Sequence, residues 1–328
     1  LLNAQGNIAE AGWSRRMLLT YDRNAIRVGK LKIKEWDYYL VNDGEYGIAL
    51  TIADNGYMGM ISASLLDFKR QWEHTQTVIK PFSMGKYNMP ASSECGDVVF
   101  AQSGLDMRFI KEENARRLQC TFDNFHEKKA LTLDIHLDEP MMDTMVIATP
   151  FDKPRHFYYN QKINCMRASG SVNWGDMHIS FAPENAFGTL DWGRGVWTYD
   201  NTWYWGSGNG EIDGKPFGFN IGYGFGNTAA ATENTLFYDG VAHKLEDVRF
   251  HIPADSFMNP WTFSSSDGRF EMDFTPVIDR AARINALVLE TDQHQVFGRF
   301  SGRAVLDDGS VLTVSNLMGF AEKVRNKY

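Results

Sequence analysis

The feature that most constrains the fold is a set of five Asp-Gly dipeptides spread along the chain. They lie at Asp43-Gly44, Asp213-Gly214, Asp239-Gly240, Asp267-Gly268 and Asp308-Gly309. Each separates two segments with strand character, whereas amphipathic helical stretches are scarce. Asp-Gly supplies the positive φ angles of the tight turns that join antiparallel strands. The sequence therefore predicts a meander of β-hairpins rather than alternating β-α units.

Composition supports the same fold class and bounds the number of domains. The 328 residues include 13% aromatic side chains and 29 Gly against 10 Pro, a balance that favours strands and tight turns. A polar stretch with Pro183 lies between Ser180 and Leu190. We therefore expect an all-β protein of two domains, residues 1–185 and 186–328, and both sizes suit a β-barrel or sandwich.

Charge and cysteine usage exclude several classes of partner. The net charge is −8 and no Lys/Arg stripe is present, which disfavours nucleic acid and an anionic membrane surface. No apolar run reaches the length of a membrane span, and the first residues lack the apolar core of a signal peptide. Three separated cysteines without a CxxC pair suit a reducing compartment, so we expect a cytoplasmic location.

Sequence motifs for cofactors are missing as well. The chain has no GxSxG elbow, P-loop, HExxH or EF-hand loop, and the spaced glycines of GYGFGN lack the strand–turn–helix context of a dinucleotide site. His243 and His251 are not accompanied by a metal-binding pattern. We expect no metal and no cofactor, and a small molecule as the partner. The sequence does not indicate an oligomeric state.

Residues 191–210 concentrate aromatic area beside charge. The segment holds Asp191, Trp192, Arg194, Trp197, Trp203 and Trp205. Such a mixture suits a cavity for an apolar, cyclic or sugar-like ligand. On a regular strand Asp191 and Arg194 face opposite ways, and a bulge at the neighbouring glycines would turn both inward. The alternative is a structural Asp–Arg ion pair under a Trp-rich core.

The segment 217–226 has one face almost without side chains. Phe217, Phe219, Ile221, Tyr223 and Phe225 share one face, and Gly218, Asn220, Gly222, Gly224 and Gly226 share the other. A bare face lets a backbone, a ring or a ligand approach closely, and the alternative is a barrel corner where Gly relieves curvature. Asn220 is the one functional side chain on this face, which makes it a candidate ligand contact.

Two further strands carry polar groups at alternate positions. In residues 157–165, Tyr158, Asn160, Lys162 and Asn164 alternate with Tyr159, Gln161 and Ile163. In residues 35–40, Glu35, Asp37 and Tyr39 alternate with Trp36, Tyr38 and Leu40. A polar strand face either meets solvent or lines a polar pocket, and both alternatives stand for these two segments.

A carboxylate and an imidazole flank one of the predicted hairpins. Glu233 precedes the turn at Asp239-Gly240 and His243 follows it, so the two side chains could approach each other across the strands. A carboxylate and an imidazole in one pocket could act as acid and base near neutral pH. The alternative is a structural histidine. Asn234, beside Glu233, is a candidate ligand contact.

Motifs along nearly the whole chain resemble those of the DUF2804 family, a domain of unknown function. The resemblance runs from near Gly12 to near Asn326. Its motifs are KEWDYY, IADNGY, FYYNQKINCM, LDWGRGVW, FGFNIGYGFGN, TENTLFYDGVAHKL, PWTFSSSDGRFEMDF, DRAAR and HQVFGRFSG. The family name implies no activity.

A more distant resemblance is to the AttH-like superfamily of carotenoid and kievitone hydratases. The EWWY-type strand of that superfamily is matched by Glu35, Trp36 and Tyr38, and its YYS-type strand by Tyr158 and Tyr159. The resemblance implies two lipocalin-like β domains and, by extension, hydratase-type chemistry.

The superfamily's WMDHEWG motif is similar to LDWGRG in this chain. The similarity places Asp191 at the position of the motif's Asp. Trp192, Gly193 and Arg194 stand where the motif carries its His and Glu, so this chain lacks that part of the pattern. The fold therefore transfers more readily than the reaction.

Together these observations predict an acid–base enzyme without a cofactor, of hydratase, isomerase or lyase type, acting on a small or medium organic molecule. Its candidate catalytic residues are Asp191, Glu233, His243, Arg194 and Glu35. Its candidate binding residues are Trp192, Trp197, Trp203, Trp205, Tyr158, Tyr159, Asn160, Lys162, Asn220 and Asn234. Two alternatives remain, namely a lipocalin-type binding protein for a hydrophobic ligand and a carbohydrate-active enzyme with paired carboxylates.

Overall fold

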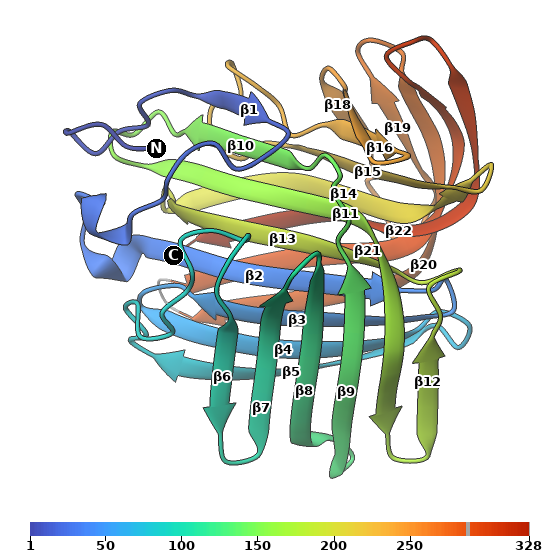
Figure 1. The fold of residues 1–328 in the computed structure, drawn as a ribbon, viewed down its shortest axis with the longest axis horizontal. Helices are drawn as coiled ribbons and strands as arrows, with labels where there is room; N and C mark the ends of the chain where they lie inside the picture. The colour runs from blue at the N-terminus through green and yellow to red at the C-terminus, as the bar shows by residue number, and fades with distance from the viewer. Residues whose placement is uncertain (287–288, 328) are drawn as a thin grey trace.

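The chain folds into two antiparallel β-sheets that lie against each other (Figure 1). The computed structural model describes residues 1–286 and 289–327, without the side chains of 284–286 and 289. Within these residues, the helical segments are two 3-10 turns, η1 (Arg23–Ala25) and η2 (Lys30–Lys32). None of the described helices is long and apolar enough to cross a membrane. The all-β prediction is confirmed.

The first sheet is built from the N-terminal strands. These are β1 (Gly12–Ser14), β2 (Ile33–Asn42), β3 (Tyr46–Asp54), β4 (Met58–Asp67), β5 (Trp72–Pro81), β6 (Val98–Gln102), β7 (Leu105–Glu112), β8 (Ala115–His126), β9 (Lys129–Asp138), β10 (Met145–Pro150), β11 (Phe157–Trp174), β12 (Met177–Phe181) and β13 (Phe187–Val196). The main path runs β5-β4-β3-β2-β13-β11-β9-β8-β7-β6, and β10 and β12 also pair with β11. In Figure 1, β6–β9 cross the direction of β2–β5 steeply, so the sheet curls around its core.

The second sheet is built from the C-terminal strands. These are β14 (Asp200–Ile212), β15 (Lys215–Tyr223), β16 (Thr235–Tyr238), β17 (Val241–Lys244), β18 (Val248–His251), β19 (Trp261–Ser265), β20 (Phe270–Ala286), β21 (Leu289–Val305) and β22 (Val311–Lys327). Their order is β17-β16-β15-β14-β22-β21-β20-β19-β18. The long strands β20–β22 curve around a core of their own (Figure 1).

The predicted Asp-Gly turns are confirmed at all five positions. Each dipeptide lies between two strands that pair antiparallel. The glycine of each has a positive φ, from +69° at Gly268 to +85° at Gly44 and Gly309. This backbone conformation costs glycine little and strains residues with a Cβ. Each of the five turns therefore joins two consecutive strands that are neighbours in a sheet.

The chain passes from the first sheet to the second between Val196 and Asp200. The boundary expected from the sequence, at 185/186, lies one strand earlier. The polar stretch at Pro183 does form a turn, but the next strand, β13, returns to the first sheet and pairs with β2 and β11. A polar turn signals a change of direction and not a change of sheet, which explains the difference.

Strand β2 separates two environments, as its alternation predicts. Tyr39 packs in the core of the first sheet, and Glu35 and Asp37 on the same face are only 1% and 4% exposed. Tyr38 faces the second sheet and meets Trp205 edge-on in a cluster that joins the two sheets. The polar-interior alternative is therefore the correct one for this strand, and the solvated alternative is wrong.

Candidate functional site

A cavity of about 430 Å³ lies where the two sheets face each other. Its aromatic lining comprises Trp36, Tyr38, Tyr158, Trp197, Trp203, Trp205 and Phe225. Its ionisable lining comprises Glu73, Lys162, Asp191, Glu233, Arg280 and Glu322. Ligand cavities of this kind are mainly apolar with a few convergent polar groups, so this cavity is the candidate functional site.

An ion pair between neighbouring strands lies at one end of the cavity. Lys162 on β11 and Asp191 on β13 are direct partners in the antiparallel register, and Nζ of Lys162 lies 2.9 Å from Oδ1 of Asp191. Asp191 also accepts hydrogen bonds from Nδ2 of Asn160 at 2.5 Å and from Nε1 of Trp36 at 3.2 Å. Three donors on one carboxylate fix its orientation.

Trp36 reaches Asp191 because Gly193, its direct partner on the neighbouring strand β13, has no side chain. A Cβ added at Gly193 would come within 1.9 Å of the Trp36 ring, so only glycine leaves room for the indole there. The predicted bulge at Gly193 and Gly195 is not formed, and β13 keeps a continuous register with β2. These glycines therefore serve close packing and not a turn of the strand.

Glu233 enters the same end of the cavity from the second sheet. It lies just before β16, and its Oε2 is 3.9 Å from Nζ of Lys162. The same oxygen accepts a hydrogen bond of 3.2 Å from Nδ2 of Asn220, whose Oδ1 accepts one of 2.7 Å from Nε1 of Trp205. Burial raises the pKa of Glu233 above its ordinary value, and the nearby Lys162 opposes that shift. The carboxyl group is thus biased toward its protonated form.

Lys162 is the centre of this cluster. Its ammonium group contacts carboxylates from both sheets and lies 3.9 Å from the ring centroid of Trp205, a cation–π contact. The Lys162 side chain is 3% exposed. The prediction that Tyr158, Asn160 and Lys162 share a polar strand face is confirmed. The solvated alternative is wrong for this face.

Aromatic rings form the wall beside the cluster. Trp36 and Tyr158 are stacked with their planes 5° apart, and Trp197 meets Trp36 edge-on at 5.2 Å. Phe225 meets Tyr158 and Trp203 edge-on. The sequence prediction placed Phe225 on the face of Phe217 and Phe219, which is wrong. Strand β15 ends at Tyr223, and the positive φ of 89° at Gly224 turns the chain toward the cavity.

A further carboxyl group lies deeper along the second sheet. Glu322 on β22 accepts hydrogen bonds of 2.9 Å from Nε1 of Trp203 and from Nε2 of Gln295. Burial raises its pKa to about 7. The sequence prediction missed this residue. The available signal was its place between Phe320 and Val324 on an otherwise apolar strand face, since a lone carboxylate there must be buried.

Four predicted site residues lie outside the cavity, in the interior of the first sheet. The Arg194 side chain is fully buried and its Nη1 donates to Oδ1 of Asp37 at 2.9 Å, while Nη2 donates to the carbonyl of Pro90. Glu35 accepts hydrogen bonds from the hydroxyl of Tyr21 and from Arg23. The buried core also holds Trp192 and Tyr159.

Arg194 therefore does not share a pocket with Asp191, and the suggested Asp191–Arg194 ion pair is not formed. The regular strand turns the two side chains to opposite faces of the first sheet. Arg194 pairs with Asp37 instead. The guanidinium also lies 4.3 Å from the ring centroid of Trp192. The contacts of Arg194 are therefore within the core of the first sheet, and its role there is structural.

His243 also lies away from the cavity. It pairs with Leu236 in the hairpin of β16 and β17, and its Nδ1 lies 3.3 Å from Oδ2 of Asp307. The expected approach of His243 to Glu233 is wrong because Glu233 precedes the paired part of β16. Asn234, also a predicted contact, holds the backbone instead by accepting from the amide of Gly222 and donating to the carbonyl of Glu246.

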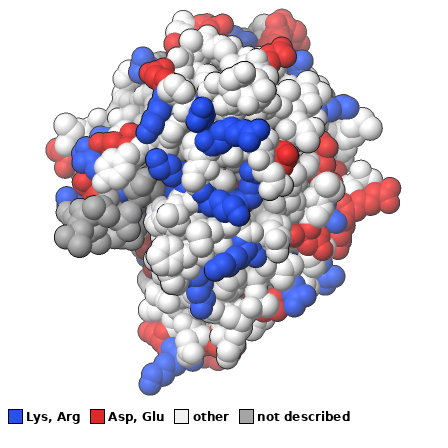
Figure 2. All heavy atoms as spheres, turned by 90° about the vertical axis from the view of Figure 1, so that its left-hand side faces the viewer, with Lys and Arg blue, Asp and Glu red and all other residues white. Residues whose placement is uncertain are grey.

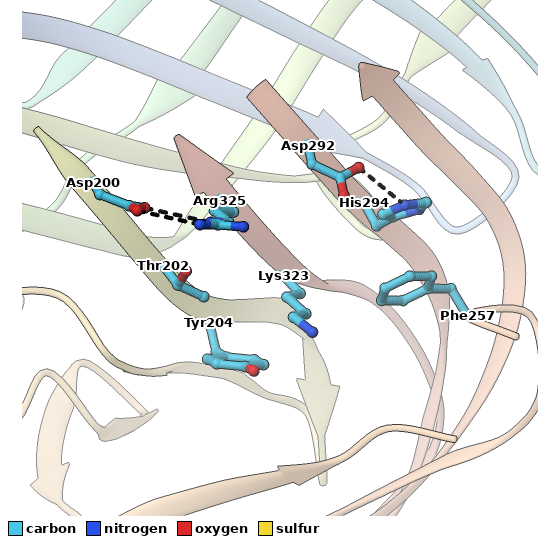
Figure 3. A pocket seen from close by; sticks show the side chains of 8 residues that line it. All are labelled: Asp200, Thr202, Tyr204, Phe257, Asp292, His294, Lys323 and Arg325. Atoms are coloured by element: carbon cyan, nitrogen blue, oxygen red, sulfur yellow. Dashed lines mark hydrogen bonds and ion pairs between the residues drawn. The ribbon is translucent and has the colours of Figure 1, made fainter. Parts of the chain in front are cut away.

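A second, polar hollow of about 660 Å³ opens on the other face of the second sheet (Figure 3). Within it, Asp200 pairs with Arg325 at 3.2 Å, and His294 lies between Asp279 and Asp292. The hollow shares no lining residue with the central cavity. No three His, Cys, Asp or Glu side chains gather as a metal site within the described part of the chain.

Comparison with solved structures gives matches that cover almost the whole chain. A kievitone hydratase from Nectria haematococca is 11% identical with a TM-score of 0.55, and the match covers 100% of this chain and 98% of that one. A candidate AttH from Nitrosomonas europaea is 14% identical with a TM-score of 0.53, and the match covers 93% of this chain and 96% of that one. These likenesses show the lipocalin-like double-sheet fold.

No curated protein matches the sequence. The pattern that defines the domain of unknown function DUF2804 matches residues 1–328. Motifs predicted that family from the sequence, and the match confirms the prediction. The chain therefore belongs to the DUF2804 family.

Proposed function

We propose that this protein is an acid–base enzyme of hydratase, isomerase or lyase type that acts on a small or medium organic molecule in the central cavity. The observation that carries the proposal is Glu233. This buried carboxyl group has a raised pKa and faces an aromatic cavity beside the Lys162–Asp191 ion pair. A carboxyl group with a raised pKa is suited to general acid catalysis.

The arrangement suits the addition of water to a carbon–carbon double bond. Glu233 would donate a proton to one carbon and leave a cation on the other, which the faces of Trp36 and Trp205 would stabilise. The carboxylate of Asp191 would orient a water molecule and accept the proton that it loses as its oxygen bonds to the cation. Exchange with solvent would return both carboxyl groups to their starting state. The reverse sequence is an elimination of water.

The fold likeness supports this reaction class, since one of the similar structures is named as a kievitone hydratase. The alternative of a carbohydrate-active enzyme is less well supported. Both carboxyl groups contact the same ammonium group, Asp191 at 2.9 Å and Glu233 at 3.9 Å, so a cation lies between the two groups. Glycosidases instead place two carboxyl groups on opposite sides of the bond they cleave.

The test uses a panel of prenylated phenols, terpenoid alkenes and unsaturated carboxylic acids incubated with the protein in heavy water. Mass spectrometry would detect the mass gain of one water molecule or the incorporation of deuterium. Glu233→Gln should lower the rate by at least about 100-fold because it removes the proton donor. His243→Gln is the control and should keep the rate of the unchanged protein. A Glu233→Gln variant with full activity would contradict the role of Glu233.

A further inference from the structure

Arg280 brings a positive charge to the part of the cavity that the proposed chemistry does not use. It lies on β20 of the second sheet and lines the cavity. Its Nη1 donates a hydrogen bond of 2.6 Å to Oγ of Ser64 on β4 of the first sheet. Among the described residues, no carboxylate lies within ion-pair distance of this guanidinium. Since a guanidinium has five N–H donors, several remain available to a ligand.

Among the described ionisable groups that line the cavity, Glu322 lies near enough for the charge of Arg280 to oppose the rise of its pKa, but the two side chains form no ion pair. Lys162 is paired with Asp191. Burial raises the pKa of Glu233 and brings that of Glu322 to about 7, so Glu322 carries only part of a negative charge at neutral pH. Glu73 accepts a hydrogen bond of 3.0 Å from Oγ1 of Thr75, at the side of the cavity formed by β5.

The two ends of the cavity differ in chemistry. Around Arg280, the first sheet contributes hydroxyl groups, since Thr75 donates to Oγ of Ser64 at 2.8 Å and Ser62 lies 3.0 Å from Thr77. The other end is the aromatic wall that includes Trp36 and Trp197. A ligand that satisfies both ends has one anionic group and an apolar body.

The outer surface favours the approach of an anion. Figure 2 shows the left-hand side of Figure 1, where Lys and Arg side chains gather across the middle of the face and most Asp and Glu side chains lie toward its margins. The segment of η1 and η2 lies on this side and carries Arg27, Lys30 and Lys32, all exposed. In a chain of net charge −8, such a face steers anions toward the molecule.

We propose that the ligand of the central cavity is an amphipathic carboxylate, with its anionic group bound by Arg280 and its ring or chain against the aromatic wall. This inference rests on the proposed function in one respect, because it takes the central cavity as the substrate site. It adds the chemical class of the substrate.

The experiment compares two probes with the same phenyl ring and a four-carbon chain, 4-phenylbutanoate with an anionic head group and 4-phenylbutan-1-ol with a neutral one. Four cavity tryptophans, Trp36, Trp197, Trp203 and Trp205, make quenching of intrinsic fluorescence a direct readout of occupancy. The carboxylate should bind roughly tenfold more tightly than the alcohol, since a hydrogen bond to a charged group exceeds one to a neutral group. Arg280→Gln should abolish this preference and leave the affinity for the alcohol within about twofold.

Two further variants keep the test decisive. Arg280→Lys retains the charge and should retain part of the preference, whereas Arg303→Gln removes an exposed arginine paired with Glu271 and should change nothing. Equal affinities for the two probes in the unchanged protein, or equal losses for both probes in Arg280→Gln, would overturn the inference. Charge-selective binding without turnover of any alkene would refute the proposed function and leave this inference standing, so the two failures can be told apart.

Discussion

The carboxyl group of Glu233 occupies the space that a side chain at residue 222 would fill. A Cβ added at Gly222 would lie 2.5 Å from Oε1 and 2.9 Å from Cδ of Glu233. Asn220, two residues earlier on the same strand face, donates a hydrogen bond to the other carboxyl oxygen. The strand face of residues 217–226 that lacks large side chains therefore provides the space in which the carboxyl group of Glu233, the proposed general acid, is held.

The first prediction concerns Gly222→Ala. The added methyl group should displace the Glu233 carboxyl group and lower turnover by about 10- to 100-fold, because a small misplacement of a catalytic group is costly. Overpacking should lower the free energy of unfolding by about 1–3 kcal/mol. Rate measurements and urea unfolding would check both effects. Gly29→Ala is the matched control, since a Cβ there meets nothing within 4 Å, and an equal loss of activity in that variant would contradict the proposed cause.

The second prediction concerns the buried ion pair of Lys162 and Asp191. Asp191→Asn or Lys162→Met alone should lower the free energy of unfolding by about 3 kcal/mol, because each leaves a buried charge without its partner. The double variant should lose clearly less than the sum of the two. A double-mutant cycle measured by urea unfolding would check this. Strict additivity would mean that the 2.9 Å contact contributes no coupling energy.

The third prediction is a loss of stability as pH rises through the range in which Glu322 titrates. Its pKa is raised from 4.5 to about 7 by burial, so between these values the folded state holds a proton that the unfolded state has released. The free energy of unfolding should therefore fall from pH 4.5 to pH 7, by about 3 kcal/mol at most from this group, and level off above.

Glu322→Gln should remove this part of the pH dependence. Gln keeps the shape of the side chain and is neutral at every pH, so the curve should flatten between pH 4.5 and pH 7. Glu184→Gln alters an exposed carboxylate and should leave the curve as it is. Urea unfolding at several pH values would check this. Parallel curves for Glu322→Gln and the unchanged protein would contradict the buried titration.

The fourth prediction is that Arg194 contributes to stability and not to ligand binding. Arg194→Met should lower the free energy of unfolding by about 3–5 kcal/mol, because Asp37 would remain buried without its ion-pair partner. The affinity of the folded variant for 4-phenylbutanoate should stay unchanged, since Arg194 faces the interior of the first sheet. Fluorescence titration at low temperature would check the affinity. Loss of binding together with an unchanged free energy of unfolding would contradict this prediction and would indicate that Arg194 contacts the ligand.

Local sequence chemistry determined much of the fold. The Asp-Gly turns could be predicted because each needs only two residues with a special backbone conformation. Strand faces could be predicted as long as the strand stayed regular, as for Lys162 on β11 and Trp36 on β2. The change of sheet between Val196 and Asp200 could not be predicted, because strand pairing depends on contacts between residues that are far apart in the sequence.

The candidate site was predictable in part for the same reason. Asp191, Glu233 and the Trp-rich segment follow from residue type and alternation, and they do meet in one cavity. Arg194 was misplaced because sequence proximity to Asp191 outweighed the strand period of two. Arg280 and Glu322 were missed because each is one charge within an ordinary strand, and only the facing of two sheets gives them a common space.

The division of the cavity between two sheets has a consequence for how the protein responds to its ligand. Lys162 and Asp191 come from the first sheet, and Glu233, Glu322 and Arg280 from the second. A bound molecule touches both walls, so its binding free energy adds to the free energy that holds the two sheets together. Ligand should therefore couple the unfolding of the two halves. A polypeptide cut between Val196 and Asp200 would give fragments that regain recognition only when they reassociate.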